Sequence, residues 1–169
     1  KKILLSRQNL LDAVVMSGGE CLLSVGIKDI ITEIKSLGYL IKIDTNGSRP
    51  EVLKDLIKNQ LIDYVALDFK ATKAKTFAIT KADFYTEFIL CLDVLLKSDI
   101  QYEVRTTLHS ALLDQSDIQE MINALSALGY SGKYYIQHFR NESETIGNPG
   151  PSYCDFNIIK IGQPTVYTV

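Results

Sequence analysis

The sequence predicts an α/β protein with a sheet of parallel strands, because short β-branched runs alternate with longer stretches of helical periodicity along its 169 residues. The helical stretches are long enough to lead from the end of one strand to the start of the next, as right-handed βαβ units require. Polar or glycine-rich segments also follow the expected strands, and ligands of such sheets bind at the carboxyl ends of strands.

Five strands are expected, each a short apolar run that turn-forming or polar residues end. They cover residues 13–16, 40–44, 64–68, 102–107 and 133–139. Apolar residues at helical spacing predict a short helix near residues 4–11 and longer helices over 27–37, 50–57, 84–96 and 117–128. Pro50 suits the first turn of a helix, and Gly38 and Gly129 are typical helix stops.

The length fits one domain, expected over residues 1–141. Residues 142–169 are expected to form a C-terminal tail, with Thr165–Val169 as an edge strand or an extension that faces a partner. A net charge of -2 provides no positive field for nucleic acid, so nucleic acid is not an expected partner. The apolar runs are too short for a membrane span, and no signal peptide opens the chain, so a cytoplasmic protein without membrane contact is expected.

The three cysteines, Cys21, Cys91 and Cys154, are widely separated. This spacing fits neither a disulfide framework nor a paired metal site, and it indicates a reducing compartment. Each cysteine is expected to be a small buried residue.

The segments after the first three strands predict a pocket for a charged ligand that resembles an amino acid. Gly18 and Gly19 let a ligand approach the backbone closely because they have no Cβ atom. Asp44 and Asp68 follow neighbouring strands and could accept hydrogen bonds from an ammonium group, or hold a hard cation.

Two cationic side chains accompany the third and fourth expected strands: Lys70 follows the strand at 64–68, and Arg105 lies within the strand at 102–107. Lys70 and Arg105 could bind a carboxylate, and the guanidinium of Arg105 could do so with two hydrogen bonds. His109 and His138 lack the spacing of metal ligands, so zinc is not expected, and each stays a candidate for contact with a ligand.

Ordered motifs at these strand ends resemble the radical S-adenosylmethionine (SAM) superfamily, and most closely the activating enzymes of glycyl radical proteins. They are Ser-Gly-Gly-Glu at 17–20, Asp-Thr-Asn-Gly at 44–47 and Asp-Phe-Lys at 68–70. Within this group, segments 9–20, 61–71, 103–107 and 136–139 resemble the anaerobic ribonucleoside-triphosphate reductase activating proteins. The resemblance runs from about Leu4 to Arg140.

The resemblance implies a partial (β/α)6 barrel, a TIM-like arrangement of parallel strands, which here lacks its first strand. It implies SAM and a [4Fe-4S] cluster as cofactors, with reductive cleavage of SAM to methionine and a 5'-deoxyadenosyl radical. That radical would abstract hydrogen from a backbone glycine of a glycyl radical protein, here anaerobic ribonucleoside-triphosphate reductase. An electron donor such as flavodoxin or ferredoxin is the other implied partner.

Eight residues match family positions that bind SAM: Ser17, Gly18, Gly19, Glu20, Asp44, Asp68, Lys70 and Arg105. The first four match the motif that binds the SAM amino group, largely through backbone atoms. Asp44 matches the acidic residue at the methionine end of SAM, and Asp68 and Lys70 match a strand end beside SAM and the substrate peptide. Arg105 matches a basic residue on a later strand, and a contact from the last strand is expected within Gln137–Phe139.

The sequence departs from the family in one respect, because the Cys-x-x-x-Cys-x-x-Cys motif that holds the cluster is missing. Cys21, Cys91 and Cys154 lie on different expected elements and cannot meet at one cluster. No metal ligand is therefore assigned in this chain, and the cluster cysteines are expected upstream of Lys1. The chain alone is expected to be inactive, and Cys21 is expected to be a packing residue, with a redox or ligand role as the alternative.

Two other functions remain open from the sequence. One is a radical SAM enzyme with another substrate, such as a pyruvate formate-lyase activase or an enzyme that acts on a small molecule. The other is an α/β module without a cluster, which binds a ligand or a protein partner.

Overall fold

The computed structural model describes residues 2–141, 149–153 and 164–169. The chain divides into two compact units, the first made of Lys1–Asp68 and Thr86–Tyr102, the second of Phe69–Tyr85 and Glu103–Val169. Within each unit the strands pair in parallel, which confirms the predicted α/β fold class. No helix in the described part of the chain is long and apolar enough to cross a membrane.

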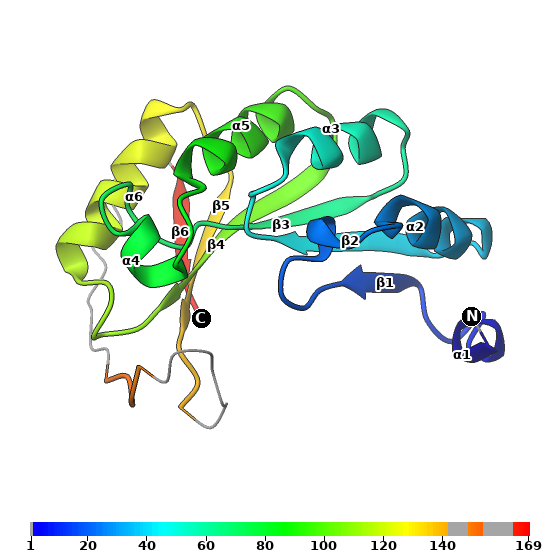
Figure 1. Cartoon of the computed structure of the whole chain (residues 1–169), viewed down its shortest axis with the longest axis horizontal. Helices are drawn as coiled ribbons and strands as arrows, with labels where there is room; N and C mark the ends of the chain where they lie inside the picture. Colours follow the sequence, from blue (N-terminus) through cyan, green and yellow to red (C-terminus); the bar gives the residue numbers. More distant parts are fainter. Residues whose placement is uncertain (1, 142–148, 154–163) are drawn as a thin grey trace. The chain divides into compact units, whose positions relative to one another are not determined.

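The first unit places three parallel strands in the order β1-β2-β3 (Figure 1). Its elements are α1 (Lys2–Ser6), β1 (Ala13–Met16), the 3-10 helix η1 (Cys21–Leu23), α2 (Ile27–Ser36), β2 (Leu40–Thr45), α3 (Pro50–Lys58), β3 (Tyr64–Asp68) and α5 (Tyr85–Leu96, which lies in this unit from residue 86 onward). Helix α1 is shorter than predicted because Asn9 has a φ of 66°, in the left-handed region where a right-handed helix cannot continue. The other predicted elements of this unit form within a few residues of their expected bounds.

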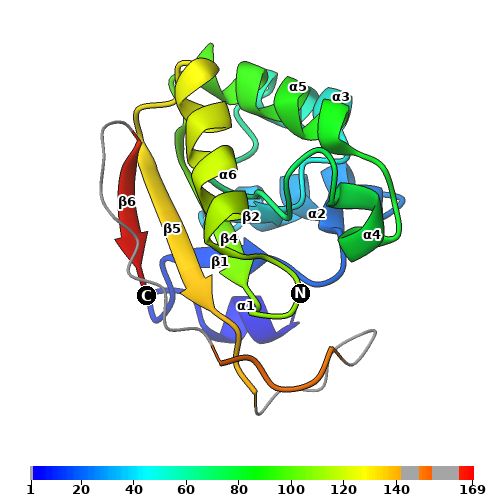
Figure 2. The same cartoon turned by 90° about the vertical axis from the view of Figure 1, so that its left-hand side faces the viewer.

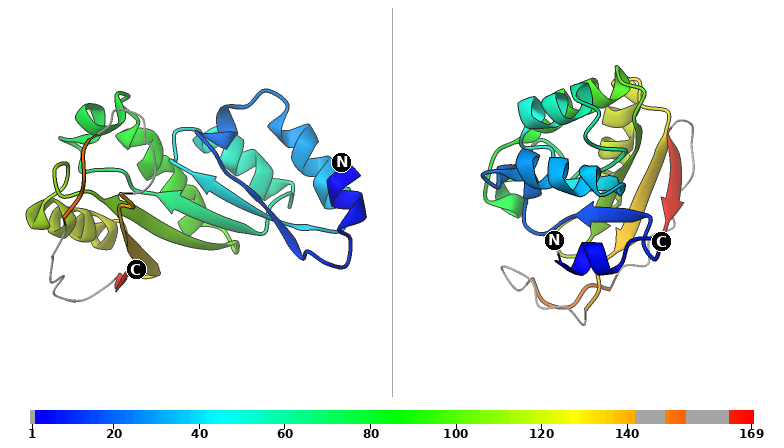
Figure 3. Two further views of the ribbon diagram at one scale, coloured as in Figure 1. Left: turned by 90° about the horizontal axis from the view of Figure 1, so that it is seen from below. Right: turned by 90° about the vertical axis from the view of Figure 1, so that its right-hand side faces the viewer.

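The two faces of these strands differ in polarity. Ile41, Ile43 and Thr45 of β2 are buried, on the face that α2 and α3 cover (Figures 1 and 3). Lys42 and Asp44 alternate with them and are only half-buried, so they lie on the opposite face, which α2 and α3 do not cover. The period-2 alternation of strand side chains thus directs the polar residues of β2 to one face.

The second unit contains a second set of parallel strands in the order β4-β5-β6. Its elements are α4 (Thr76–Thr80), β4 (Gln101–Leu108, of which Glu103–Leu108 lies in this unit), α6 (Gln115–Ala127), β5 (Lys133–His138) and β6 (Thr165–Thr168). Figure 2 shows α6 alongside β5, with β6 at the outer side of β5. Strand β6 falls in the segment for which an edge strand or an extension was expected. Gly147 of the expected tail, and Cys154, lie outside the described residues.

Helix α6 begins at a capping box. The carboxylate of Asp114 accepts a hydrogen bond from the backbone N–H of Asp117 (3.0 Å), and the carboxylate of Asp117 accepts one from the N–H of Asp114 (2.7 Å). Lys75 Nζ lies 2.5 Å from Asp117 Oδ2. This contact attaches the segment that precedes α4 to the start of α6.

Candidate functional site

Two exposed glycines follow β1 and leave its backbone open to a ligand. Gly18 has a φ of 105° and Gly19 a φ of 56°, in the left-handed region that glycine adopts without strain. A Cβ atom added to either residue would meet no atom within 4 Å. The backbone conformation, rather than crowding, therefore favours glycine here, and the exposed peptide groups suit a ligand that carries an amino-acid moiety.

The carboxylate of Glu20 connects the loop after β1 to the loop after β2. Glu20 Oε1 accepts hydrogen bonds from Thr45 Oγ1 (2.8 Å) and from the backbone N–H of Leu22 (3.1 Å). Glu20 Oε2 accepts one from the N–H of Asn46 (2.7 Å). Thr45 Oγ1 in turn accepts a hydrogen bond from the N–H of Gly47 (3.1 Å). Both oxygens of Glu20 are thus engaged within the protein, and its side chain holds the two loops together.

Asp44 and Asp68 lie on the face of the first unit that α2 and α3 do not cover. The register pairs Asp44 with Ala66, so Asp68 lies two residues farther along the neighbouring strand and points to the same side. Asp44 Oδ1 is 3.7 Å from Lys42 Nζ, and the Lys42 ammonium lies 5.4 Å from the centre of the Tyr64 ring. The structure therefore brings these two predicted carboxylates to one face, beside Lys42, which was not among the predicted site residues.

The two described cysteines are buried, as predicted. Cys21 Sγ donates to the carbonyl of Asp44 (3.4 Å), and Cys91 Sγ donates to the carbonyl of Gly47 (3.1 Å). Burial, together with the negative charge of Glu20, raises the pKa of Cys21 to about 11 and that of Cys91 to about 12. Both thiols therefore stay protonated at neutral pH.

These cysteines do not fit a [4Fe-4S] cluster. They lie on η1 and α5, each is bonded to a different backbone carbonyl, and a cluster requires thiolates that converge on it. Within the described residues, no group of three or more His, Cys, Asp or Glu side chains could hold a metal ion. The exposed backbone at Gly18 and Gly19 and the carboxylate of Asp44, by contrast, fit the amino-acid part of SAM.

The other two predicted cations belong to the second unit, where Lys70 and Arg105 are both half-buried. Phe69 precedes Lys70 and is attached to β4 through both of its backbone polar groups. Its N–H donates to the carbonyl of Arg105 (2.7 Å), and its carbonyl accepts from Thr106 Oγ1 (2.6 Å). The hydroxyl of Tyr134 lies 2.6 Å from Thr106 Oγ1. Local patterns did not reveal Thr106 and Tyr134, because their contact joins residues on two strands.

A pocket of about 680 Å³ lies at the carboxyl ends of β4 and β5, where the sequence predicted a contact from the last strand. Its lining includes the aromatic ring of Phe139 and the imidazole of His138. Its lining residues are Thr107, Gln137, His138, Phe139, Arg140, Asn141 and Val169.

His109, the other candidate histidine, is buried and has a structural role. Its Nε2 lies 2.9 Å from the carbonyl of Gly150, and its Nδ1 accepts a hydrogen bond from the N–H of Ala111 (3.2 Å). A nitrogen that accepts carries no proton, so Nε2 is the donor to Gly150. Both nitrogens are therefore used within the protein.

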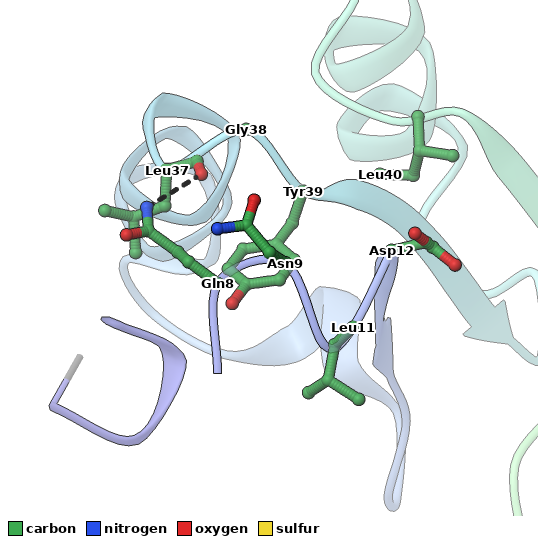
Figure 4. A pocket seen from close by; sticks show the side chains of 8 residues that line it. All are labelled: Gln8, Asn9, Leu11, Asp12, Leu37, Gly38, Tyr39 and Leu40. Atoms are coloured by element: carbon green, nitrogen blue, oxygen red, sulfur yellow. Dashed lines mark hydrogen bonds between the residues drawn. The ribbon is translucent and has the colours of Figure 1, made fainter. Parts of the chain in front are cut away.

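A second pocket, of about 590 Å³, lies at the amino ends of β1 and β2 (Figure 4). Gln8 donates a hydrogen bond to the carbonyl of Leu37 (3.2 Å), and among the lining residues Asp12 is the acidic one and none is basic. The pocket lies at the strand ends opposite to Gly18, Asp44 and Asp68. It lacks the set of charged groups that the predicted chemistry requires, and we do not assign the site to it.

Comparison with solved structures shows where this fold occurs. A domain of a pyruvate-formate lyase-activating enzyme from Bacteroides vulgatus matches with a TM-score of 0.64 and 17% identity, over 79% of this chain and 84% of that chain. Streptococcus suis SuiB matches with a TM-score of 0.59 and 15% identity, over 92% of this chain and 35% of that chain. At these identities the matches show the fold alone. That fold is an α/β arrangement of parallel strands, consistent with a partial TIM-like barrel.

In sequence, the chain is similar to a protein named "Putative glycyl-radical enzyme activating enzyme MJ1227", from Methanocaldococcus jannaschii. It is 38% identical over 137 residues, which cover 76% of this chain and 55% of the relative. The chain thus spans about half the length of that relative. No family model matches the sequence.

Proposed function

We propose that this chain is the SAM-binding part of a cytoplasmic enzyme that generates a glycyl radical on anaerobic ribonucleoside-triphosphate reductase. The observation that carries the proposal is the arrangement at the carboxyl ends of β1 and β2. Glu20 holds the two loops together there, while the backbone of Gly18 and Gly19 stays exposed near the carboxylate of Asp44. The identity to a relative named as a glycyl-radical enzyme activating enzyme supports the same class of activity.

In this proposal the first unit binds the amino-acid end of SAM. Carbonyl groups of Ser17–Gly19 and the carboxylate of Asp44 accept hydrogen bonds from the ammonium group of SAM. Asp68 lies on the same face and takes part in holding SAM or the substrate peptide. In the second unit, Lys70 and Arg105 provide positive charge for a carboxylate, and the pocket that includes His138 offers aromatic and hydrogen-bonding groups to a planar ring.

A [4Fe-4S] cluster would supply the electron that cleaves SAM, and the resulting 5'-deoxyadenosyl radical would take hydrogen from the partner's glycine. The cysteines described in this chain do not fit such a cluster. We propose that its ligands form a Cys-x-x-x-Cys-x-x-Cys motif upstream of Lys1 in the complete protein, and that flavodoxin or ferredoxin delivers the electron. The residues of this chain then bind and orient SAM.

The test is electron paramagnetic resonance of the reductase after anaerobic incubation with the complete protein, SAM and a reductant. We expect a doublet signal of a glycyl radical that depends on SAM. A parallel reaction with a pyruvate formate-lyase type partner separates the two activase functions, since a signal only there would assign this chain to that partner. No signal from either partner, with 5'-deoxyadenosine still formed, would indicate a small-molecule substrate. A complete protein that binds no iron would favour the ligand-binding or partner-binding module.

A further inference from the structure

We propose that Thr106 and Tyr134 are positioning residues for Lys70 and Arg105, the two cations of the second unit. This inference rests on the proposed function, in which these two cations bind a carboxylate. Thr106 and Tyr134 act through the backbone of Phe69.

The direction of each hydrogen bond follows from the atoms present. The carbonyl of Phe69 can only accept, so Thr106 Oγ1 donates its single proton to it (2.6 Å). Thr106 then has only lone pairs left for Tyr134, whose hydroxyl must donate to Thr106 Oγ1 (2.6 Å). The three groups form one directed chain, Tyr134 to Thr106 to Phe69. A chain of this kind polarises each of its members and strengthens both bonds.

All three members of this hydrogen-bond chain are buried. Thr106 is 1% exposed, Phe69 2% and Tyr134 0%, so water cannot replace a missing partner. The pKa of the Tyr134 hydroxyl is raised by complete burial, which keeps the group protonated as a donor. Removal of one hydroxyl would leave the next group in the chain without its hydrogen bond in a dry interior, and such a loss costs more than the bond itself contributes.

The hydrogen-bond chain acts on Lys70 and Arg105 through neighbouring backbone atoms. Phe69 also donates its N–H to the carbonyl of Arg105 (2.7 Å), so its two polar groups are bound to two consecutive residues of β4. This double attachment fixes the peptide from which Lys70 extends. Arg105 precedes Thr106 in β4, so its side chain points to the opposite face from the buried hydroxyl. Loss of the Thr106 bond therefore loosens the backbone next to both cations.

Four variants of the complete protein test this proposal. Tyr134→Phe and Thr106→Val each remove one hydroxyl group of the chain, and Thr106→Ser keeps the hydroxyl while it removes only a methyl group. Tyr130→Phe is the matched control, because Tyr130 is also a buried tyrosine bonded to β4. Its hydroxyl accepts from the N–H of Val104 (3.2 Å) and donates to the carbonyl of Lys133 (2.5 Å), toward the amino ends of β4 and β5.

Two readouts are measured under anaerobic conditions: hydrogen exchange of the Phe69 amide, and the affinity for radiolabelled SAM by equilibrium dialysis. We expect Tyr134→Phe and Thr106→Val to speed exchange at Phe69 and to weaken SAM binding about fivefold, as the loss of one hydrogen bond predicts. Thr106→Ser should restore both values. Tyr130→Phe should lower the melting temperature at least as much as Tyr134→Phe and leave SAM affinity unchanged.

The outcomes separate this inference from the proposed function. If the wild-type protein binds SAM and neither Tyr134→Phe nor Thr106→Val weakens binding more than Tyr130→Phe does, the positioning role is wrong while the proposed function stands. If the wild-type protein binds no SAM, the proposed function is wrong, and the positioning role is overturned with it. Should Thr106→Val fail to fold, the comparison of Tyr134→Phe with Tyr130→Phe decides alone.

Discussion

The side chain of Glu20 joins the loop after β1 to the loop after β2 through hydrogen bonds, and this explains why a carboxylate suits its position. The Ser-Gly-Gly-Glu motif predicts a place for Glu20 at the SAM amino group. In the structure, its two oxygens receive three hydrogen bonds from Leu22, Thr45 and Asn46. Its contribution to a SAM site would therefore be indirect, because it places the backbone of Gly18 and Gly19 next to the loop that follows Asp44.

This role predicts a graded effect of substitution at Glu20. Glu20→Ala leaves two backbone N–H groups and the Thr45 hydroxyl without their acceptor, and we expect it to lower the free energy of unfolding by about 2 kcal/mol. Glu20→Gln keeps one acceptor oxygen and should lose less. Urea unfolding of the two variants measures the difference. An alanine variant as stable as the wild type would show that the loops are held together without this carboxylate.

The buried cysteines predict a pattern of chemical labelling. Because burial raises the pKa of Cys21 to about 11 and that of Cys91 to about 12, iodoacetamide should modify neither residue in the folded protein at pH 8. Both should react after denaturation, and peptide mass spectrometry identifies each site. Rapid labelling of native Cys21 would instead support the redox or ligand role.

The raised pKa values of Cys21 and Cys91 make the stability of the folded protein fall at alkaline pH. The folded state keeps both thiol protons above pH 9, where unfolded thiols with an ordinary pKa lose theirs. The contribution of the thiols is therefore complete below pH 9 and is lost as the pH rises through about 11 to 12. We expect a smaller loss of stability across this range in a Cys91→Ala variant than in the wild type.

At the scale of elements, the loop after β2 depends on a glycine for two reasons. Gly47 has a φ of 78°, and an added Cβ would lie 3.0 Å from Leu67 Cδ1 and 3.1 Å from Phe88 Cα. Backbone strain and overlap therefore act together, and we expect Gly47→Ala to destabilise the protein by about 3 kcal/mol.

A control at Gly38 separates the two effects. Its φ is 90°, but no atom lies within 4 Å of an added Cβ, so Gly38→Ala introduces strain without overlap and should cost roughly 1–2 kcal/mol. Thermal or urea unfolding of both variants gives the comparison. Equal losses at the two positions would mean that the packing of Leu67 and Phe88 adjusts freely to the new methyl group.

The strands were predictable from the sequence because each is a short apolar run with clear ends, and β1, β2 and β3 form where expected. Helix α4 was not predicted, since its five residues are too few to show a periodicity. Alternation places Asp44 and Asp68 on one face only once the register between β2 and β3 is known. The contacts of Glu20 with Asn46 and of Thr106 with Tyr134 depend on register between strands, which a local pattern does not contain.

At the scale of the whole molecule, the chain consists of two compact units and spans about half of the relative it matches. The first unit contains Ser17–Glu20, Asp44 and Asp68, and the second contains Lys70 and Arg105. The described cysteines do not fit a cluster, so the proposal assigns SAM binding to this chain and the cluster ligands to residues upstream of it. This division of roles is the central claim about the protein.

The formation of 5'-deoxyadenosine tests this claim most directly. The complete protein is reconstituted anaerobically with iron and sulfide, then incubated with SAM, with and without dithionite, and the products are separated by chromatography. We predict 5'-deoxyadenosine only when the reductant is present, and much less of it in an Asp44→Asn variant with the same iron content. A complete protein that holds its cluster and binds SAM but forms no 5'-deoxyadenosine would contradict the account.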